Sequence, residues 1–130
     1  MFNCFYQNIT YCDNYDPMSF IGLWLDYGVW SDIEYWKLEK DLLAINQFYS
    51  EGLMIPNEIS RGLMRIIQIM MVSDWQDFAI LEEGKKYTLD DDWGHPDIFD
   101  RYERFKYILG VFYDRDVNLS NIGFGYFLRE

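Results

Sequence analysis

The chain has 130 residues, half of them apolar and a fifth aromatic, which is enough apolar surface for one folded domain over residues 1–130 and excludes a disordered chain. Its 11 Lys and Arg against 22 Asp and Glu give a formal net charge of −11, which disfavours direct binding to nucleic acid or to an anionic membrane. The charge favours a basic protein as partner. Acidic proteins also carry such charge for solubility alone, so both interpretations stay open.

The N-terminal segment, MFNCFYQN, has neither the basic region nor the apolar region of a secretory signal. We therefore expect a cytoplasmic protein in which Cys4 and Cys12 are reduced thiols. The longest apolar stretch, residues 63–72, is about half as long as a membrane span and contains Arg65 and Gln68. We expect no transmembrane helix.

Residues 17–30 form a short apolar segment after Asp16. The segment is compatible with a helix that begins at Pro17 or with a strand, and we favour the helix. Ser31-Asp32-Ile33-Glu34 then matches a capping box, in which the Ser hydroxyl and the Glu carboxylate bond to free backbone amides. Apolar residues at alternating spacings of three and four follow, so we predict an amphipathic helix that ends near Gly52. Its stripe comprises Tyr35, Leu38, Leu42, Ile45 and Tyr49.

Two further helices are predicted from the same periodicity. One opens at residues 56–58 and carries Ile59, Leu63, Ile66, Ile67 and Met70 on one face. Because Met64, Ile69, Met71 and Val72 widen that stripe, we expect this helix to be the most buried. The other begins after His95-Pro96-Asp97 and has Ile98, Tyr102, Phe105, Leu109 and Phe112 as its stripe, flanked by Asp100, Arg101, Glu103, Arg104 and Lys106.

Residues 75–89 suggest a short helix and an extended piece, and residues 122–128 a strand or irregular coil. Three strong helical patterns and no convincing alternation of period two predict an all-α fold, a compact single-domain helical bundle with a short β or irregular C-terminal segment.

The sequence shows no convincing catalytic or cofactor motif. His95, the only histidine, lies between Gly94 and Pro96 in a predicted turn, and two cysteines with one distant histidine cannot form a zinc site. Residues 114–118, DRDVN, match the first ligands of a calcium loop, which then fails at Leu119, where the turn needs glycine. No phosphate-binding or dinucleotide-binding glycine loop occurs. We expect no cofactor, no metal and no enzymatic activity.

Acidic residues beside aromatic rings are the candidates for partner binding. Asp90, Asp91 and Asp92 precede Trp93, an arrangement in which the ring anchors a contact and the acids steer a basic surface. The alternative is a solvated loop with Trp93 packed in the core. A rival acidic surface comprises Asp13, Asp16 and Asp26. Five Trp, 11 Tyr and 10 Phe also exceed what so small a core hides, so we expect exposed aromatic residues at an interface.

The N-terminal third carries a pattern of aromatic and acidic residues. It comprises NITYCDNY at residues 8–15, SFIG at residues 19–22, Trp30, and EYWKL at residues 34–38. In this pattern the chain resembles immunity protein family 41, whose members accompany bacterial polymorphic toxins, including contact-dependent growth inhibition systems. The resemblance covers roughly residues 8–45.

The resemblance implies a cytoplasmic protein that binds one cognate toxin C-terminal domain and blocks it without catalysis. Many such toxins are nucleases, and their basic clefts suit an acidic inhibitor that acts by steric and electrostatic occlusion. A second hypothesis is an acidic interaction module or nucleic-acid mimic without a toxin partner. A third is a small enzyme that uses carboxylates in an aromatic pocket, which requires a concave cleft with convergent acids.

Overall fold

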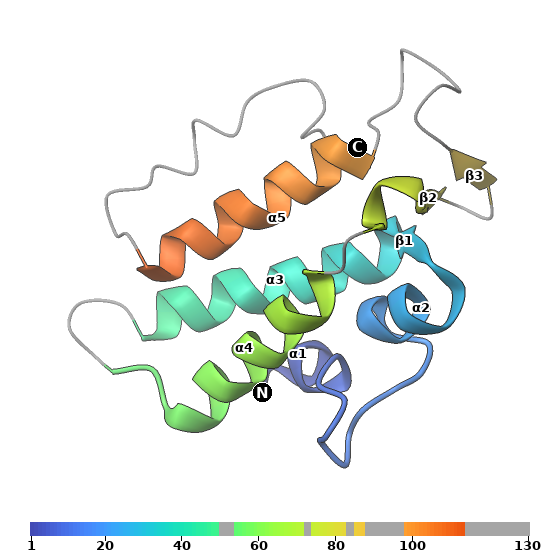
Figure 1. Cartoon of the computed structure of the whole chain (residues 1–130). Coiled ribbons are helices and arrows are strands. Elements are labelled where there is room, and N and C mark those ends of the chain that lie inside the picture. Colours follow the sequence, from blue (N-terminus) through green and yellow to red (C-terminus); the bar gives the residue numbers. More distant parts are fainter. Residues whose placement is uncertain (50–53, 72–73, 83–84, 88–97, 114–130) are drawn as a thin grey trace.

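The computed structural model describes residues 1–49, 54–71, 74–82, 85–87 and 98–113. These residues form a mostly helical domain with one small sheet (Figure 1), so the predicted helical class is confirmed. The elements are α1 (Asn3–Gln7), α2 (Phe20–Tyr27), β1 (Val29–Ser31), α3 (Asp32–Phe48), α4 (Asn57–Met70), a 3₁₀ turn (Trp75–Asp77), β2 (Ala79–Glu82), β3 (Lys85–Tyr87) and α5 (Ile98–Tyr113).

Helix α3 is the central element. Figure 1 shows α5 running along one side of it, while α1 packs elsewhere on α3, and α2 and the sheet lie near its first turns. Helix α4 contacts α2 and closes over α1 at Gly62, where an added Cβ would lie 2.3 Å from Cδ1 of Ile9. Glycine at this position therefore lets α4 approach the N-terminal segment closely.

The segment at residues 17–30 contains both of the structures that the sequence left open. Helix α2 is capped by Ser19, whose Oγ accepts a hydrogen bond from the Gly22 amide at 3.2 Å. It ends at Gly28, whose φ of 60° lies in the left-handed region that glycine tolerates. Strand β1 follows directly, and Ser31 then caps α3 by accepting from the Glu34 amide at 3.3 Å. The Glu34 carboxylate pairs with Lys37 at 2.6 Å, so only the serine half of the predicted capping box forms.

The sequence allowed a strand within residues 17–30, but it did not predict the small sheet. Its strand order is β1-β2-β3, with β1 parallel to β2 and β2 antiparallel to β3. All three residues of β1 are buried, so no alternation of polar and apolar residues marks it in the sequence. The short helix and extended piece expected at residues 75–89 correspond to the 3₁₀ turn, β2 and β3. The C-terminal segment at 122–128 lies outside the described residues.

Aromatic rings from α2, β1 and α3 form the centre of the core. Phe20 packs edge-on against Trp30 with ring centroids 4.7 Å apart, and Trp30 contacts Tyr35 at the same distance. All three side chains are fully buried. The apolar stripe of α3 continues this core through Leu38, Leu42 and Ile45, as its periodicity predicts.

The expectation that α4 is the most buried helix is wrong. Met64 is 49% exposed and Met71 71% exposed, so these two residues of the wide stripe face solvent. Five consecutive residues of α2, residues 20–24, are buried instead, because α2 is enclosed by β1, α3 and α4. Apolar composition alone did not reveal which helix would be surrounded.

Candidate functional site

The predicted acidic residues fall on different parts of the chain. Asp13 and Asp26 are exposed, and Asp16 is half-buried, with one carboxylate oxygen accepting a hydrogen bond from the Met18 amide at 2.9 Å. Burial, and next the charges of Asp26 and Asp16, raise the pKa of the Tyr15 hydroxyl, so these two acids lie near one ring. Asp90, Asp91, Asp92 and Trp93 lie outside the described residues, as do His95 and residues 114–118.

Buried Asn8 fixes the loop that carries Asp13 and Asp16. Its side-chain amide donates to the Cys4 carbonyl at 2.7 Å, and its carbonyl oxygen accepts from the Ile21 amide at 2.8 Å. One side chain thus connects α1 with the first turn of α2. The Asp16 amide also donates to the Gln7 carbonyl at 2.9 Å, which closes the loop against α1. The loop is therefore a positioned element of the fold.

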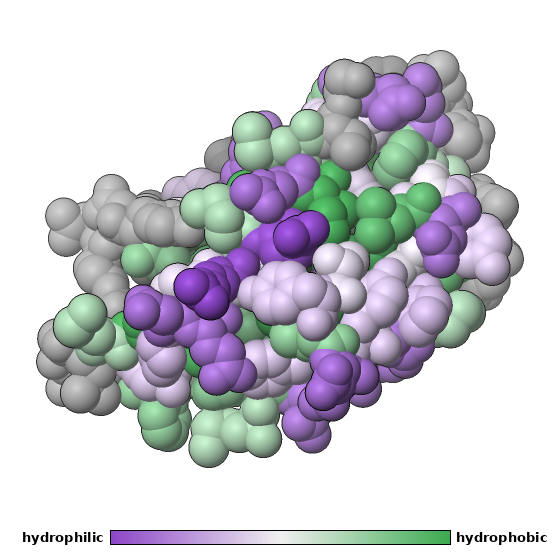
Figure 2. All heavy atoms as spheres, turned by 60° about the horizontal axis from the view of Figure 1, so that its bottom comes forward, coloured by the Kyte–Doolittle hydropathy of each residue, from purple (hydrophilic) through white to green (hydrophobic). Residues whose placement is uncertain are grey.

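A shallow groove lies between this loop and the start of α4. It has a volume of about 430 Å³ and is lined by Tyr6, Tyr11, Cys12, Asp13, Asn14 and Glu58. We call these six residues the N-terminal groove. Figure 2 views the molecule from the side that carries α1, the loop and α4, and shows strongly hydrophilic residues interspersed with residues of intermediate hydropathy. Asp13, a predicted site residue, lines the same groove as Glu58, which the sequence analysis did not single out.

The electrostatics of the groove keep its hydroxyl and thiol protonated near neutral pH. Burial, followed by Glu58, raises the pKa of Tyr6, while burial, followed by Glu58 and Asp13, raises the pKa of Cys12. A thiol with a raised pKa is a poor nucleophile. In the described part of the chain, no group of three or more His, Cys, Asp and Glu residues could hold a metal ion. The groove thus offers carboxylates, aromatic rings and neutral donors, which are suited to binding.

Tyr11 already contacts a cation of the chain. The guanidinium carbon of Arg65, on α4, lies 5.5 Å from the centroid of the Tyr11 ring, within the range of a cation–π interaction. Tyr11 is itself 53% exposed. Exposed aromatic residues were expected, and Tyr27, Phe48 and Phe99 also have large exposed fractions.

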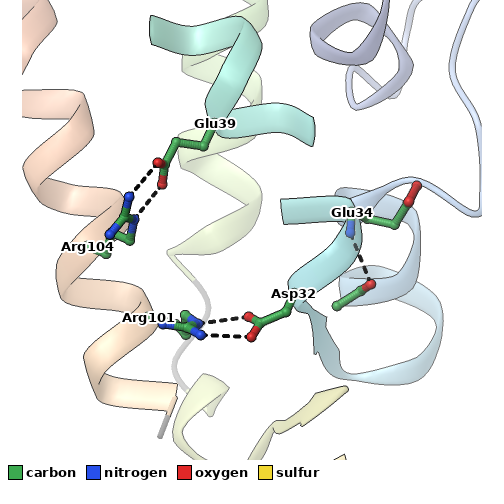
Figure 3. Close-up of polar contacts among 6 residues, drawn as sticks. Asp32, Glu34, Glu39, Arg101 and Arg104 are labelled. Atoms are coloured by element: carbon green, nitrogen blue, oxygen red, sulfur yellow. Dashed lines mark hydrogen bonds and ion pairs between the residues drawn. The ribbon is translucent and has the colours of Figure 1, made fainter. Parts of the chain in front are cut away.

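A second cluster of charges lies inside the molecule, between α3 and α5. Arg101 binds Asp32 through two hydrogen bonds of 2.8 Å, and Arg104 binds Glu39 through two of 2.7 Å (Figure 3). The Arg101–Asp32 pair is 2% exposed on both sides. Both guanidinium groups also lie over the ring of Trp36, at 4.8 and 5.0 Å from its centroid.

Arg101 and Arg104 flank the apolar stripe of α5 in the sequence, and the structure withdraws both from solvent, since Arg101 is 2% and Arg104 16% exposed. Their burial is possible because each guanidinium meets a carboxylate in bidentate geometry. Their spacing in the sequence gave no signal for this pairing, since Asp32 and Glu39 lie about two helical turns apart and Arg101 and Arg104 about one. The cluster joins two helices and is enclosed by the protein, so we assign it to the fold.

Comparison with known proteins identifies one family. The family model described as Immunity protein 41 matches residues 7–124. No curated protein and no solved structure matches the chain. The match includes α2, α3, α4 and α5, the loop after α1, and every residue of the N-terminal groove except Tyr6.

Proposed function

The chain belongs to the immunity protein 41 family, and we propose from this that it binds a cognate bacterial toxin domain in the cytoplasm and neutralises it by steric and electrostatic occlusion. Family membership is the observation that carries the proposal. An inhibitor of this kind acts by contact and needs no catalysis of its own.

The charge of the chain supports a basic toxin, and a nuclease is the class we propose. A nuclease cleft that holds phosphates carries positive potential, and a protein of net charge −11 is attracted to it. Association should then slow as salt is added, because salt screens the attraction between exposed charges. A toxin with a neutral or acidic surface would not show this dependence.

Two acidic surfaces are proposed contacts for the toxin. One comprises Asp13, Asp16 and Asp26 on the N-terminal side of the fold. The other comprises Asp90, Asp91, Asp92 and Trp93, which lie outside the described residues. The first surface has support from geometry, because the Asp16 amide donates to the Gln7 carbonyl of α1 and Asn8 accepts from the Ile21 amide of α2, which holds the loop that carries Asp13 and Asp16.

A growth assay tests the proposal. The C-terminal domain encoded by the gene immediately upstream is expressed in cells with and without this protein. We expect growth to be restored when both are present and the two proteins to purify together. If both proteins are expressed well, with neither rescue nor a complex, toxin neutralisation is excluded for that pair. Binding to nucleic-acid-handling proteins of the host would then favour an acidic mimic.

A further inference from the structure

The N-terminal groove has the chemistry of a receptor for a single cationic side chain. Asp13 and Glu58 are exposed carboxylates that come from two different segments of the chain. Tyr6 and Tyr11 supply aromatic rings to the same hollow. Carboxylates and aromatic faces both bind ammonium and guanidinium ions in proteins.

A contact inside the chain supports this chemistry independently of the charge. The guanidinium of Arg65 lies over the Tyr11 ring at 5.5 Å, so this ring binds a cation of the chain on one face in the folded protein, and a cation of the partner would contact its other face or edge. The Cys12 thiol and Tyr6 hydroxyl are neutral near neutral pH, so they add no charge of their own. An anionic ligand such as a phosphate would instead be repelled by the two carboxylates of the groove.

We propose that the N-terminal groove receives an arginine or lysine side chain of the toxin, with Asp13 and Glu58 as its ionic partners and the rings of Tyr6 and Tyr11 as its walls. This inference rests on the proposed function and assigns one contact within it. The position of the groove is fixed by the attachment of its loop to α1 and α2, so the receptor is formed before the partner arrives.

A matched pair of variants tests the contact. Asp13→Asn with Glu58→Gln removes two negative charges from the groove, and Asp74→Asn with Asp77→Asn removes two from exposed positions at the 3₁₀ turn. Affinity for the purified toxin domain is measured by calorimetry at about 0.15 M salt. We expect the groove variant to bind at least about 10-fold more weakly than the wild type, and the control variant to change less than about threefold.

The outcomes separate this inference from the proposed function. Equal losses in the two variants, or no loss in the groove variant, would overturn the groove contact and leave toxin binding intact. If the wild-type protein binds no toxin domain, the proposed function fails, and a second measurement decides the groove chemistry.

That second measurement is an NMR titration of the ¹⁵N-labelled protein with Nα-acetyl-arginine amide, with the uncharged citrulline amide as control. We expect the amide signals of Tyr11, Cys12, Asp13 and Asn14 to shift with the arginine compound alone, and the shifts to vanish in the groove variant. Equal shifts with citrulline, or none with arginine, would show that the groove does not select a cation.

Discussion

Between α3 and α5, Asp32 and Glu39 each face an arginine and are withdrawn from solvent, whereas Asp13 and Glu58 face an open groove. The same chemical group therefore has two roles in one small protein. An enclosed carboxylate needs its partner within the chain, because desolvation of an unpaired charge is costly. An exposed carboxylate has no such need and remains available to a partner molecule. The comparison separates acids that hold the fold together from acids that can bind.

The largest effect should come from breaking the enclosed pair. Arg101→Met leaves the Asp32 carboxylate buried without its partner, and we expect a loss of about 3–5 kcal/mol in the free energy of unfolding. Chemical denaturation measures it, with Arg61→Met, an exposed arginine of α4, as the control. The double variant Asp32→Leu/Arg101→Met should recover most of the loss. A loss below about 1 kcal/mol in the single variant would mean that solvent reaches the carboxylate.

A smaller loss is expected where the acidic loop is attached to the fold. Asn8→Ala removes the acceptor of the buried Ile21 amide and the donor to the Cys4 carbonyl, so we expect a loss of about 1–3 kcal/mol in denaturation. Asn14→Ala, an exposed asparagine of the same loop, is the matched control and should be neutral. Similar stabilities of the two variants would show that the Asn8 bonds do not hold the loop.

The enclosed region should also respond to alkaline pH. Burial first, and then Glu39, raises the pKa of Tyr35 well above its ordinary value of 10.0. The unfolded chain therefore loses this proton at a lower pH than the folded protein. Stability from Tyr35 is fully present below the unfolded pKa and is lost as pH rises towards the folded pKa.

Tyr35→Phe isolates this response. The variant keeps the buried ring and lacks the titrating hydroxyl, so its stability at about pH 8 serves as the reference for the comparison. Between about pH 8 and pH 10.5 the wild type should lose about 1 kcal/mol more than the variant in urea titrations. Parallel losses in the two proteins would assign the alkaline transition to other groups.

The smallest effect on stability is expected in the groove. Asp13→Asn with Glu58→Gln changes exposed side chains, so the denaturation midpoint should stay close to that of the wild type. The same variant is the one expected to lose affinity for the toxin. If the variant lost both stability and affinity, Asp13 and Glu58 would stabilise the fold as Asp32 and Glu39 do. The two regions would then not differ in role.

The helices with local signals could be predicted from the order of the residues alone. The spacing of Tyr35, Leu38 and Leu42 predicts α3, and the buried face of α4 follows Ile59, Leu63 and Ile66 as expected. Ser31 predicts where α3 begins, and its hydroxyl does cap the helix. These features depend on residues within one or two helical turns of each other, so they can be predicted from the sequence.

Which charges are enclosed and which line a groove depends on contacts between distant segments of the chain. The Arg101–Asp32 pair joins residues 69 positions apart, and its burial depends on α5 lying along α3. The groove likewise needs α4 to close over α1, which brings Glu58 to Asp13. Periodicity assigns a residue to a face of its own helix, but it does not specify which face another segment will cover. That choice follows from the packing of the whole chain.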